Sequence, residues 1–491
     1  MFKTLANAWK IKDLRSKLLF TLFIILVYRI GTSIPVPFVN ASVVFGGQSD
    51  GSIFGFLNTL SGGAFENGSL FALGVAPYIT ASIVVQLLSI AIPALERLAK
   101  QGEEGKKAIN AITRYITIAI SIVTAIGYYM LLRSMKNEET GVTGLSNFAT
   151  DSEYAGFAAV VIIACFVAGS CVVMWLGEKI NEHGIGNGIS IILFANIVSR
   201  AYPLLMKFIA MFQFERSGYE VHTGEYEITS EGGIQEKVDV ISGNTIPLGS
   251  IIFTILVLIG LLAMIWFVIH ISDSERRIPV QYAKRVVGRK MYGGQNSNIP
   301  LKVNMAGVMP IIFANAILTI PATIAMFITP TYIGGDYKTY TREPWNTIVN
   351  FMSQSSWFYA LLTFILILAF AYFYVAISFN PFEVSGNLQK NGGAVPGIRP
   401  GKATAMFIKK VLSKVTFIGA LSLSVICVIP LIINVVIVNL TSVNVAFMAF
   451  TYLSELAQCG TSVVIVVGVI IETVREIESQ MTMRHYKGFL G

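Results

Sequence analysis

The sequence has 491 residues, of which 54% are hydrophobic and 13% charged, and its mean hydropathy is +0.67. A soluble domain carries about twice that charged fraction, so the composition excludes an ordinary soluble protein and indicates a polytopic membrane protein. The net charge of +8 would also suit a nucleic-acid-binding protein, but in a membrane protein such an excess more often anchors cytoplasmic segments.

Ten apolar segments of spanning length follow a basic amino-terminal stretch. They cover roughly residues 18–34, 70–92, 110–132, 155–176, 189–211, 248–270, 304–328, 357–378, 411–435 and 447–471. Lysine and arginine gather in the connecting segments on the amino-terminal side, and the positive-inside rule then places both termini in the cytoplasm. The first apolar run lacks a small-residue cleavage site, so we expect no cleaved signal peptide.

An octet pattern occurs twice, at residues 74–81 and 307–314. The same residue recurs at five offsets: Gly74/Gly307, Val75/Val308, Pro77/Pro310, Ile79/Ile312 and Ala81/Ala314. Chance is one explanation, because Gly, Val, Ile and Ala are common in membrane spans. A duplicated half is the other. The predicted topology favours duplication, because the two copies then begin spans that enter the membrane from opposite sides.

The repeat predicts an all-helical membrane protein with ten transmembrane helices in two inverted five-helix halves. The amino-terminal half covers residues 1–211, and the carboxy-terminal half covers residues 248–491. Between them lies an external polar segment, 212–247. Weak alternation on either side of Gly232-Gly233 predicts a small β-hairpin there, outside the membrane.

Residues 52–66 are an unusual stretch. They are too apolar for an ordinary loop, and too short and too interrupted by glycine to span a membrane. A half-inserted element fits, since irregular backbone at membrane depth is tolerated only inside protein or beside a wet cavity. The alternative is an interfacial helix that lies on the membrane.

Ionisable residues are rare inside the predicted spans. We interpret the exceptions, which are Arg29, Arg200, His270 and Glu455, as interfacial or structural charges. An ion-coupled transporter usually keeps such groups at mid-membrane, where they bind or relay the ion. The four cysteines and four histidines show no metal-ligand spacing, so we expect no metal and no other cofactor.

Aliphatic side chains instead share faces of the predicted spans. Ile79 and Ile83 lie one helical turn apart, as do Ile189 and Leu193. Aliphatic rings can close a water-filled pore by dewetting, although most such residues simply pack or face lipid.

Small polar residues punctuate spans two and seven: Thr80, Ser82, Gln86 and Asn315. Interhelix hydrogen bonding is their usual role, and each such bond contributes only about 0.6 kcal/mol on average in membranes. If the two spans touch, we expect a weak polar seam that can part.

Two strongly basic segments, 272–303 and 379–410, lie on the predicted cytoplasmic side. They serve either to fix topology and bind anionic lipids, or to dock an acidic partner such as a protein or ribosomal RNA. Residues 397–402 (GIRPGK) fail the spacing of a phosphate-binding loop. No motor is visible in the sequence, so any uphill work requires a partner.

The chain resembles the SecY family of bacterial protein-conducting channels nearly from end to end. The most specific stretches are 72–83 (ALGVAPYITASI), 175–190 (WLGEKINEHGIGNGIS), 300–310 (PLKVNMAGVMP) and 395–401 (VPGIRPG). The resemblance implies an hourglass of helices in the bacterial plasma membrane, clamped by a SecE-like and often a SecG-like small subunit. Such a chain is not an enzyme. It passes unfolded secretory precursors with signal sequences and releases membrane segments laterally into lipid, driven by a SecA-like ATPase or a ribosome.

The resemblance also implies roles for individual residues. A sealing ring around the passing chain would comprise Ile79, Ile83, Ile189, Leu193, Ile312 and Ile465, with leucine at 193 where isoleucine is expected. A plug, residues 52–66, would present Phe54, Phe56, Leu57, Leu60 and Phe65. A lateral gate between spans two and seven would carry Thr80, Ser82, Gln86 and Asn315. The docking surface for motor and ribosome would include Arg285, Arg289 and Arg399.

Segment 212–247 is longer than the resemblance leads us to expect, and we interpret it as an insertion. Two other classes of protein remain open from the residues alone. A ten-span secondary transporter for small solutes would be favoured by an acidic or histidine residue at mid-span. A membrane enzyme would need a convergent catalytic set, which the sequence does not show.

Overall fold

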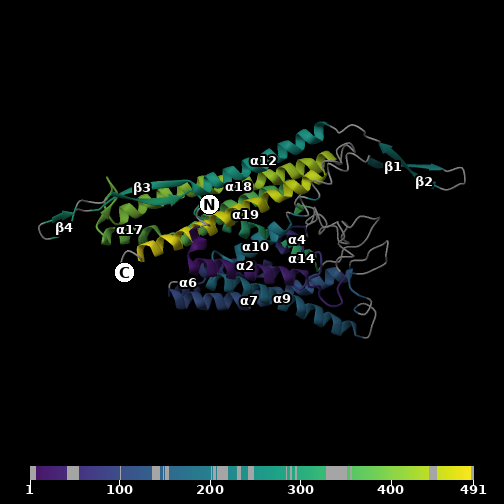
Figure 1. The fold of residues 1–491 in the computed structure, drawn as a ribbon, viewed down its shortest axis with the longest axis horizontal. Helices are drawn as coiled ribbons and strands as arrows, with labels where there is room; N and C mark the ends of the chain where they lie inside the picture. The colour runs from purple at the N-terminus through teal and green to yellow at the C-terminus, as the bar shows by residue number, and fades with distance from the viewer. Residues whose placement is uncertain are drawn as a thin grey trace.

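The computed structural model is a bundle of long helices with small β-sheets at its two ends (Figure 1). The structure describes residues 7–40, 55–99, 101–134, 144–146, 149, 154–200, 202, 206, 219–228, 234–241, 248–282, 285–287, 290–292, 296–327, 351–353, 356–441 and 451–487.

In the amino-terminal part of the bundle, the helices differ from the predicted spans mainly in where they bend or end. Its helices are α2 (Lys12–Ser33), α4 (Gly55–Ser61), α5 (Ala76–Ala91), α6 (Pro93–Ala99), α7 (Glu103–Ser134), α9 (Ala155–His183) and α10 (Gly188–Ser199). The chain bends by 106° between α5 and α6. Pro93 causes this break, because proline lacks an amide donor and is favoured at the first position of a new helix. Helix α10 ends at Ser199, well before the predicted end of span five.

The carboxy-terminal part contains the longest helices. They are α12 (Leu248–Asp273), α13 (Met309–Leu318), α14 (Ile320–Ala325), α16 (Trp357–Ser378), α17 (Pro381–Lys390), α18 (Lys402–Thr441) and α19 (Thr451–Lys487). The predicted span seven is divided, because α13 ends at Leu318 and α14 begins at Ile320. Helices α12, α18 and α19 pack against one another along one side of the bundle (Figure 1).

Several helices are long and apolar enough to cross a membrane. Within the described residues four pass on length and composition: Glu104–Arg133, Ala155–His183, Trp357–Lys390 and Lys402–Val436. The bent pair α5 and α6 adds a fifth if it counts as one span. Helix α10, the described end of α12, and the α13–α14 pair are apolar but shorter. The chain is therefore a helical membrane protein, and the expected ten spans remain a prediction.

Three small sheets lie in the connections between helices. Strands β1 (Tyr219–Ile228) and β2 (Ile234–Ile241) pair antiparallel, which confirms the predicted hairpin, and its place outside the membrane stays a prediction. Strands β3 (Glu275–Tyr282), β6 (Asn296–Lys302) and β7 (Gly393–Ala394) form a sheet in the order β6-β3-β7, and β4 (Arg285–Val287) pairs with β5 (Lys290–Tyr292). The two basic segments therefore contain strands that their sequence did not predict.

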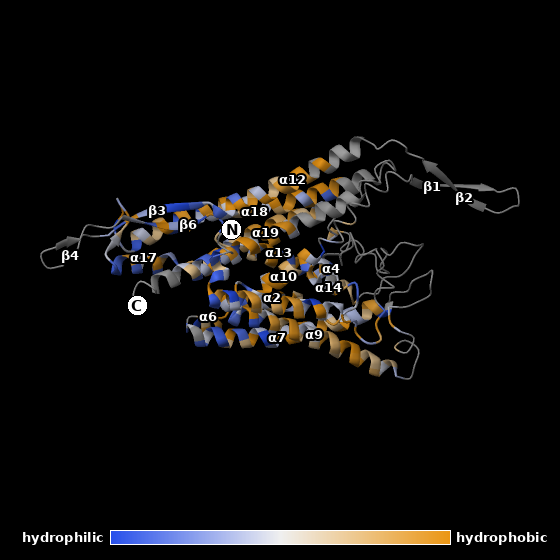
Figure 2. Cartoon of the chain, in the orientation of Figure 1, coloured by the Kyte–Doolittle hydropathy of each residue, from blue (hydrophilic) through white to orange (hydrophobic). Residues whose placement is uncertain are grey.

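The largest apolar cluster lies in the middle of the bundle. It joins side chains from α2, α5, α9, α10, α12, α13, α16, α18 and α19. Figure 2 shows apolar residues along the middle of the helices and polar residues gathered at the end that carries α6 and α17. Many large apolar side chains nevertheless face outward, and on α2 they form a stripe: Leu22, Phe23, Leu26 and Ile30 are each more than half exposed. An apolar outer surface of this kind is what a lipid environment requires.

Candidate functional site

The two octets adopt the same local structure. Gly74 and Gly307 have positive φ angles of 54° and 62°, which glycine adopts without the steric cost of a side chain. The valine that follows each glycine is the N-cap of a helix, and each helix has a proline in its first turn. Proline is well tolerated there because its missing amide hydrogen has no partner in the first turn. The two helices that begin in this way, α5 and α13, pack against each other.

A tight constriction lies where these helices meet the centre of the bundle. Its cavity is lined by aliphatic side chains from four helices, Ile79 of α5, Leu193 of α10, Ile312 of α13 and Ile465 of α19, together with Leu60 of α4. Each of these five side chains is buried. The cavity has a volume of about 10 Å³, which holds at most about one water molecule. Two polar residues, Asn315 and Thr319, also line it. The structure therefore brings residues far apart in the sequence together into one small, mostly aliphatic constriction.

Two further predicted ring residues lie close to this constriction without lining it. Ile83 is buried in the same apolar cluster, and Ile189 packs against that cluster. Each is one helical turn from a lining residue, Ile79 or Leu193 respectively. Four of the six predicted ring residues therefore line the observed constriction.

The stretch 52–66 is buried inside the bundle, as far as the structure describes it. Its helix α4 places Leu60 in the constriction, while Leu57 and Phe65 line a neighbouring pocket. Phe65 also packs against the ring of Tyr128, with ring centroids 4.6 Å apart. These contacts favour the half-inserted interpretation over a helix on the membrane surface. Of the other predicted plug residues, Phe54 and the Phe56 side chain lie outside the described part of the chain.

The polar residues predicted for the α5–α13 seam bond within their own helix. Thr80 Oγ1 donates to the carbonyl of Ala76 at 3.0 Å, and Gln86 Nε2 donates to Ser82 Oγ at 3.2 Å. Asn315 of α13 is buried, and its amide nitrogen has no hydrogen-bond partner among the described residues. The expected contact between the two helices is present, but the interhelix hydrogen bonds expected at it are not seen in the described part of the chain.

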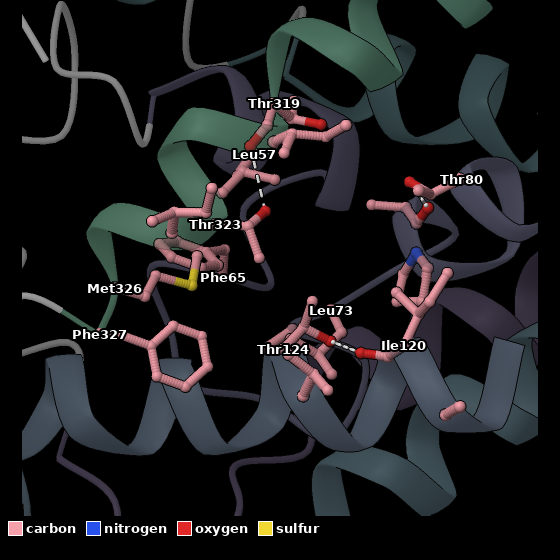
Figure 3. A pocket seen from close by; sticks show the side chains of 17 residues that line it. Leu57, Phe65, Leu73, Thr80, Ile120, Thr124, Thr319, Thr323, Met326 and Phe327 are labelled. Carbon is pink, nitrogen blue, oxygen red and sulfur yellow. Dashed lines mark hydrogen bonds between the residues drawn. The ribbon is translucent and has the colours of Figure 1, made fainter. Parts of the chain in front are cut away.

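An apolar pocket of about 430 Å³ opens beside this seam. Figure 3 shows Phe65, Met326 and Phe327 at the left of the pocket and Thr80 at the right. Threonines also line the pocket, but their hydroxyls donate to their own helices, as Thr124 Oγ1 does to the Ile120 carbonyl at 2.9 Å. The threonines therefore present methyl groups, and the pocket suits an apolar guest.

The two basic segments meet in one sheet. Strand β7 of segment 379–410 pairs with β3 of segment 272–303, with Gln281 opposite Ala394 and Tyr282 opposite Gly393. Alternate residues of β3 point inward, and one of them, Ile278, joins a buried cluster with side chains from both segments. We call this sheet with the loop 395–401 the basic platform.

Two of the three predicted docking arginines, Arg399 and Arg285, lie in described parts of the basic segments. Arg399 is exposed on the loop after β7. Its carbonyl accepts a hydrogen bond from Thr404 Oγ1 at 2.9 Å, and Ser385 Oγ donates to the Gly401 carbonyl at 2.7 Å, so the loop is held in place. Arg285 begins β4, and Arg289 lies outside the described residues.

Charges around the basic platform are partly paired. Arg277 bonds Glu275 at 2.6 Å, and Arg475 of α19 bonds Asp273 at 2.9 Å. Burial lowers the pKa of Lys302 from its usual range, and the nearby Arg475 guanidinium acts in the same direction. These pairs lie at the Glu275 end of β3, whereas Arg399 follows β7, which pairs with the Gln281–Tyr282 end of the same strand.

Two ionisable residues of the predicted spans, the partly buried Arg200 and the exposed His270, have contacts of a structural kind. Arg200 donates to Thr59 Oγ1 at 2.9 Å, and His270 stacks on Trp266 with ring centroids 5.5 Å apart. Across the described residues, no group of three or more His, Cys, Asp or Glu could hold a metal ion.

Sequence analysis missed the buried polar residues that contact the stretch 52–66. Asn196 of α10 bonds the carbonyl of Leu60, and Tyr128 of α7 donates its hydroxyl to the carbonyl of Phe65. The signal for Asn196 was present, because it is an amide side chain in the middle of an apolar segment.

Comparison with solved structures identifies the class of protein. One structure, described as that of a protein conducting channel, matches with a TM-score of 0.58 and 18% identity, over 95% of this chain and 92% of that chain. Another, whose description concerns the plug domain of the SecY protein and the closed state of the translocation channel, matches with a TM-score of 0.55 and 18% identity, over 95% and 92% of the two chains. This chain therefore has the fold of those helical membrane channels.

Comparison of sequences identifies the family. The sequence model of SecY matches residues 69–474. The protein translocase subunit SecY of Streptomyces coelicolor is 40% identical over 494 residues, a match that covers 100% of each chain. The chain belongs to the SecY family, which confirms the resemblance seen in its motifs.

Proposed function

We propose that this chain is the pore-forming subunit of a protein translocation channel. The observation that carries the proposal is the small, mostly aliphatic constriction that Leu60 helps to line. The chain is a channel subunit and not an enzyme. Membership of the SecY family and the channel fold favour this function over a secondary transporter for small solutes.

The constriction suits a polypeptide as its cargo. Aliphatic side chains exclude water and ions when they pack together, because a narrow apolar passage dewets. They form no directional bonds, so they can part around an unfolded chain of any sequence and close behind it. Leu60 and the rest of the segment 52–66 act as a plug that leaves the constriction when a precursor enters. The full ring includes Ile83 and Ile189, which approach the passing chain as the constriction widens.

The seam between α5 and α13 is the lateral gate. Thr80, Ser82 and Gln86 bond within α5, so separating the two helices breaks none of these bonds. Asn315 is buried at the seam, and its amide nitrogen, which has no hydrogen-bond partner in the described part of the chain, meets water or a precursor when the seam opens. Signal sequences and apolar membrane segments leave the channel through this seam into lipid.

The basic platform docks the partner that drives transport. Arg399 stands on a loop fixed by two hydrogen bonds, which keeps its charge available to an acidic surface. Arg285 and Arg289 extend this surface. Its partners are a SecA-like ATPase and the ribosome, whose phosphates favour arginine contacts.

The membrane arrangement follows the charge pattern of the sequence. Ten helices in two inverted halves, residues 1–211 and 248–491, cross the bacterial plasma membrane with both termini in the cytoplasm. SecE-like and SecG-like small subunits cover part of the apolar outer surface, and the remaining basic residues bind anionic lipids.

Reconstitution tests this function directly. The chain is purified with its small subunits, placed in vesicles, and supplied with a SecA-like ATPase, ATP and an unfolded precursor with a signal sequence. We expect the precursor to become protease-resistant in an ATP-dependent manner, and vesicles without the chain to give no protection. Uptake of small solutes without any protected precursor would contradict the proposal.

A further inference from the structure

The plug residue Leu60 is held at two points by the same helix. Its side chain lies in the constriction with Leu193 of α10. Its backbone carbonyl accepts a hydrogen bond of 2.6 Å from Nδ2 of Asn196, three residues further along α10. Residues three apart on a helix share a face, so one face of α10 contacts both the side chain and the backbone of Leu60.

The Asn196 amide is oriented by a second helix. Its Nδ2 also donates to the hydroxyl of Tyr28 in α2, at 2.9 Å. Both side chains are fully buried. The Tyr28 ring stacks on Phe71, with ring centroids 5.5 Å apart. Because Tyr28 is fixed by packing, it directs the second hydrogen of the amide to the plug.

A neighbouring contact extends the attachment. Arg200, one helical turn beyond Asn196, donates from Nη1 to Thr59 Oγ1 at 2.9 Å. Asn196 in α10 and Arg200, which caps the end of α10, therefore hold two consecutive plug residues, Leu60 and Thr59.

The plug lies very close to α2 and α10, but two buried polar atoms at this contact lack hydrogen-bond partners among the described residues. Gly62 passes so near that a Cβ atom there would lie 2.8 Å from Arg29 Nη1 and 2.9 Å from Asn196 Oδ1. These two polar atoms are buried, and neither has a hydrogen-bond partner among the described residues. Such atoms are costly to keep dry and are satisfied when water enters. The docked plug is thus held by an attachment that can be released.

We propose that Asn196, oriented by Tyr28, is a positioning residue that couples release of the plug to widening of the constriction. Leu193 and Asn196 move together because they lie on one helix. When a precursor displaces α10 outward, Leu193 leaves the Leu60 side chain and Asn196 leaves the Leu60 carbonyl in the same movement. This coupling presupposes the channel function proposed above.

The same contact sets how readily the resting channel opens. Replacing Asn196 with leucine keeps a side chain of similar size but removes the donor. In this variant the Leu60 carbonyl has lost its Asn196 donor while the plug is docked. Once the plug leaves, water donates to that carbonyl. The substitution therefore destabilises the closed state more than the open state and shifts the population toward opening.

The experiment compares three variants in the complete complex with its small subunits. Asn196→Leu removes the donor, Tyr28→Phe removes only the group that orients it, and Asn434→Leu makes the same chemical change at another buried asparagine, on α18. Resting ion conductance is measured in planar bilayers. ATP-dependent transport is measured in vesicles for a precursor with an intact signal sequence and for one with a weakened signal sequence.

We expect Asn196→Leu to raise the resting open fraction by about tenfold, as loss of a buried hydrogen-bond donor implies. The ratio of weakened-signal to intact-signal transport should rise with it, and Tyr28→Phe should shift both quantities less, in the same direction. Asn434→Leu should match the unsubstituted channel. If Asn196→Leu fails to assemble, the Tyr28→Phe result decides.

Two results would overturn the coupling. One is a transport-competent Asn196→Leu channel whose conductance and signal ratio equal those of the Asn434→Leu control. The other is an unchanged Tyr28→Phe channel where Asn196→Leu does not assemble. Failure of the channel function looks different, because the unsubstituted complex would then give no protected precursor at all.

Discussion

Replacing Leu60 with alanine should open the resting channel. The Leu60 side chain is 8% exposed and fills the constriction. Alanine removes three carbon atoms. At about 0.8 kcal/mol per buried carbon group, the docked plug loses about 2 kcal/mol of the free energy gained by apolar burial. The open state loses little, because Leu60 is then in water. A change of about 2 kcal/mol shifts the balance of closed and open channels about 30-fold.

Single-channel recording in planar bilayers measures this shift without a precursor. The control is Leu22→Ala, which makes the same change on the exposed apolar stripe of α2. We expect frequent resting openings for Leu60→Ala and none beyond the background for Leu22→Ala. A Leu60→Ala channel as silent as the control would refute the assignment of Leu60 to the seal.

Three further predictions follow from the site. Asparagine at both Ile79 and Ile312 should hydrate the constriction and leak ions at rest, and an unchanged bilayer conductance would remove these residues from the ring. Arg399→Glu should reduce motor-driven precursor transport at least several-fold while the complex stays folded, whereas Lys414→Glu, an equal charge change on an exposed face of α18 outside the two basic segments, should have little effect. Gly62→Ala should loosen the plug and raise the resting conductance, because the added Cβ would lie 2.8 Å from Arg29 Nη1 and 2.9 Å from Asn196 Oδ1. Resting conductance of Gly62→Ala equal to that of the unsubstituted channel would contradict the close approach of the plug.

Much of the arrangement was readable from local sequence. The repeated glycine, valine and proline of the octets predict two equivalent helix starts, and Gly74 and Gly307 adopt the same left-handed conformation. The composition of 52–66 predicts an element buried in protein. The alternation around Gly232-Gly233 predicts the hairpin of β1 and β2. In each case a few neighbouring residues determine the backbone.

Contacts between distant segments were harder to predict. The pairing of β3 with β7 depends on two short strands more than 100 residues apart, and two residues of β7 carry too little pattern to reveal it. The seam between α5 and α13 was expected to be hydrogen-bonded, but a threonine such as Thr80 can donate to its own helix. The role of Asn196 depends on the carbonyl it meets, which the sequence does not specify.

The central claim is that an unfolded polypeptide passes between Ile79 and Ile312, and crosslinking to a stalled precursor tests it most directly. In a chain whose four native cysteines are replaced, single cysteines are placed at 79, at 312 and, as a control, at the exposed Leu22. A precursor with one cysteine and a folded carboxy-terminal domain is stalled during transport and then oxidised. We predict disulfides from positions 79 and 312 to the precursor, and none from position 22. Crosslinks from position 22 alone, with none from 79 or 312 in an actively transporting complex, would contradict the account.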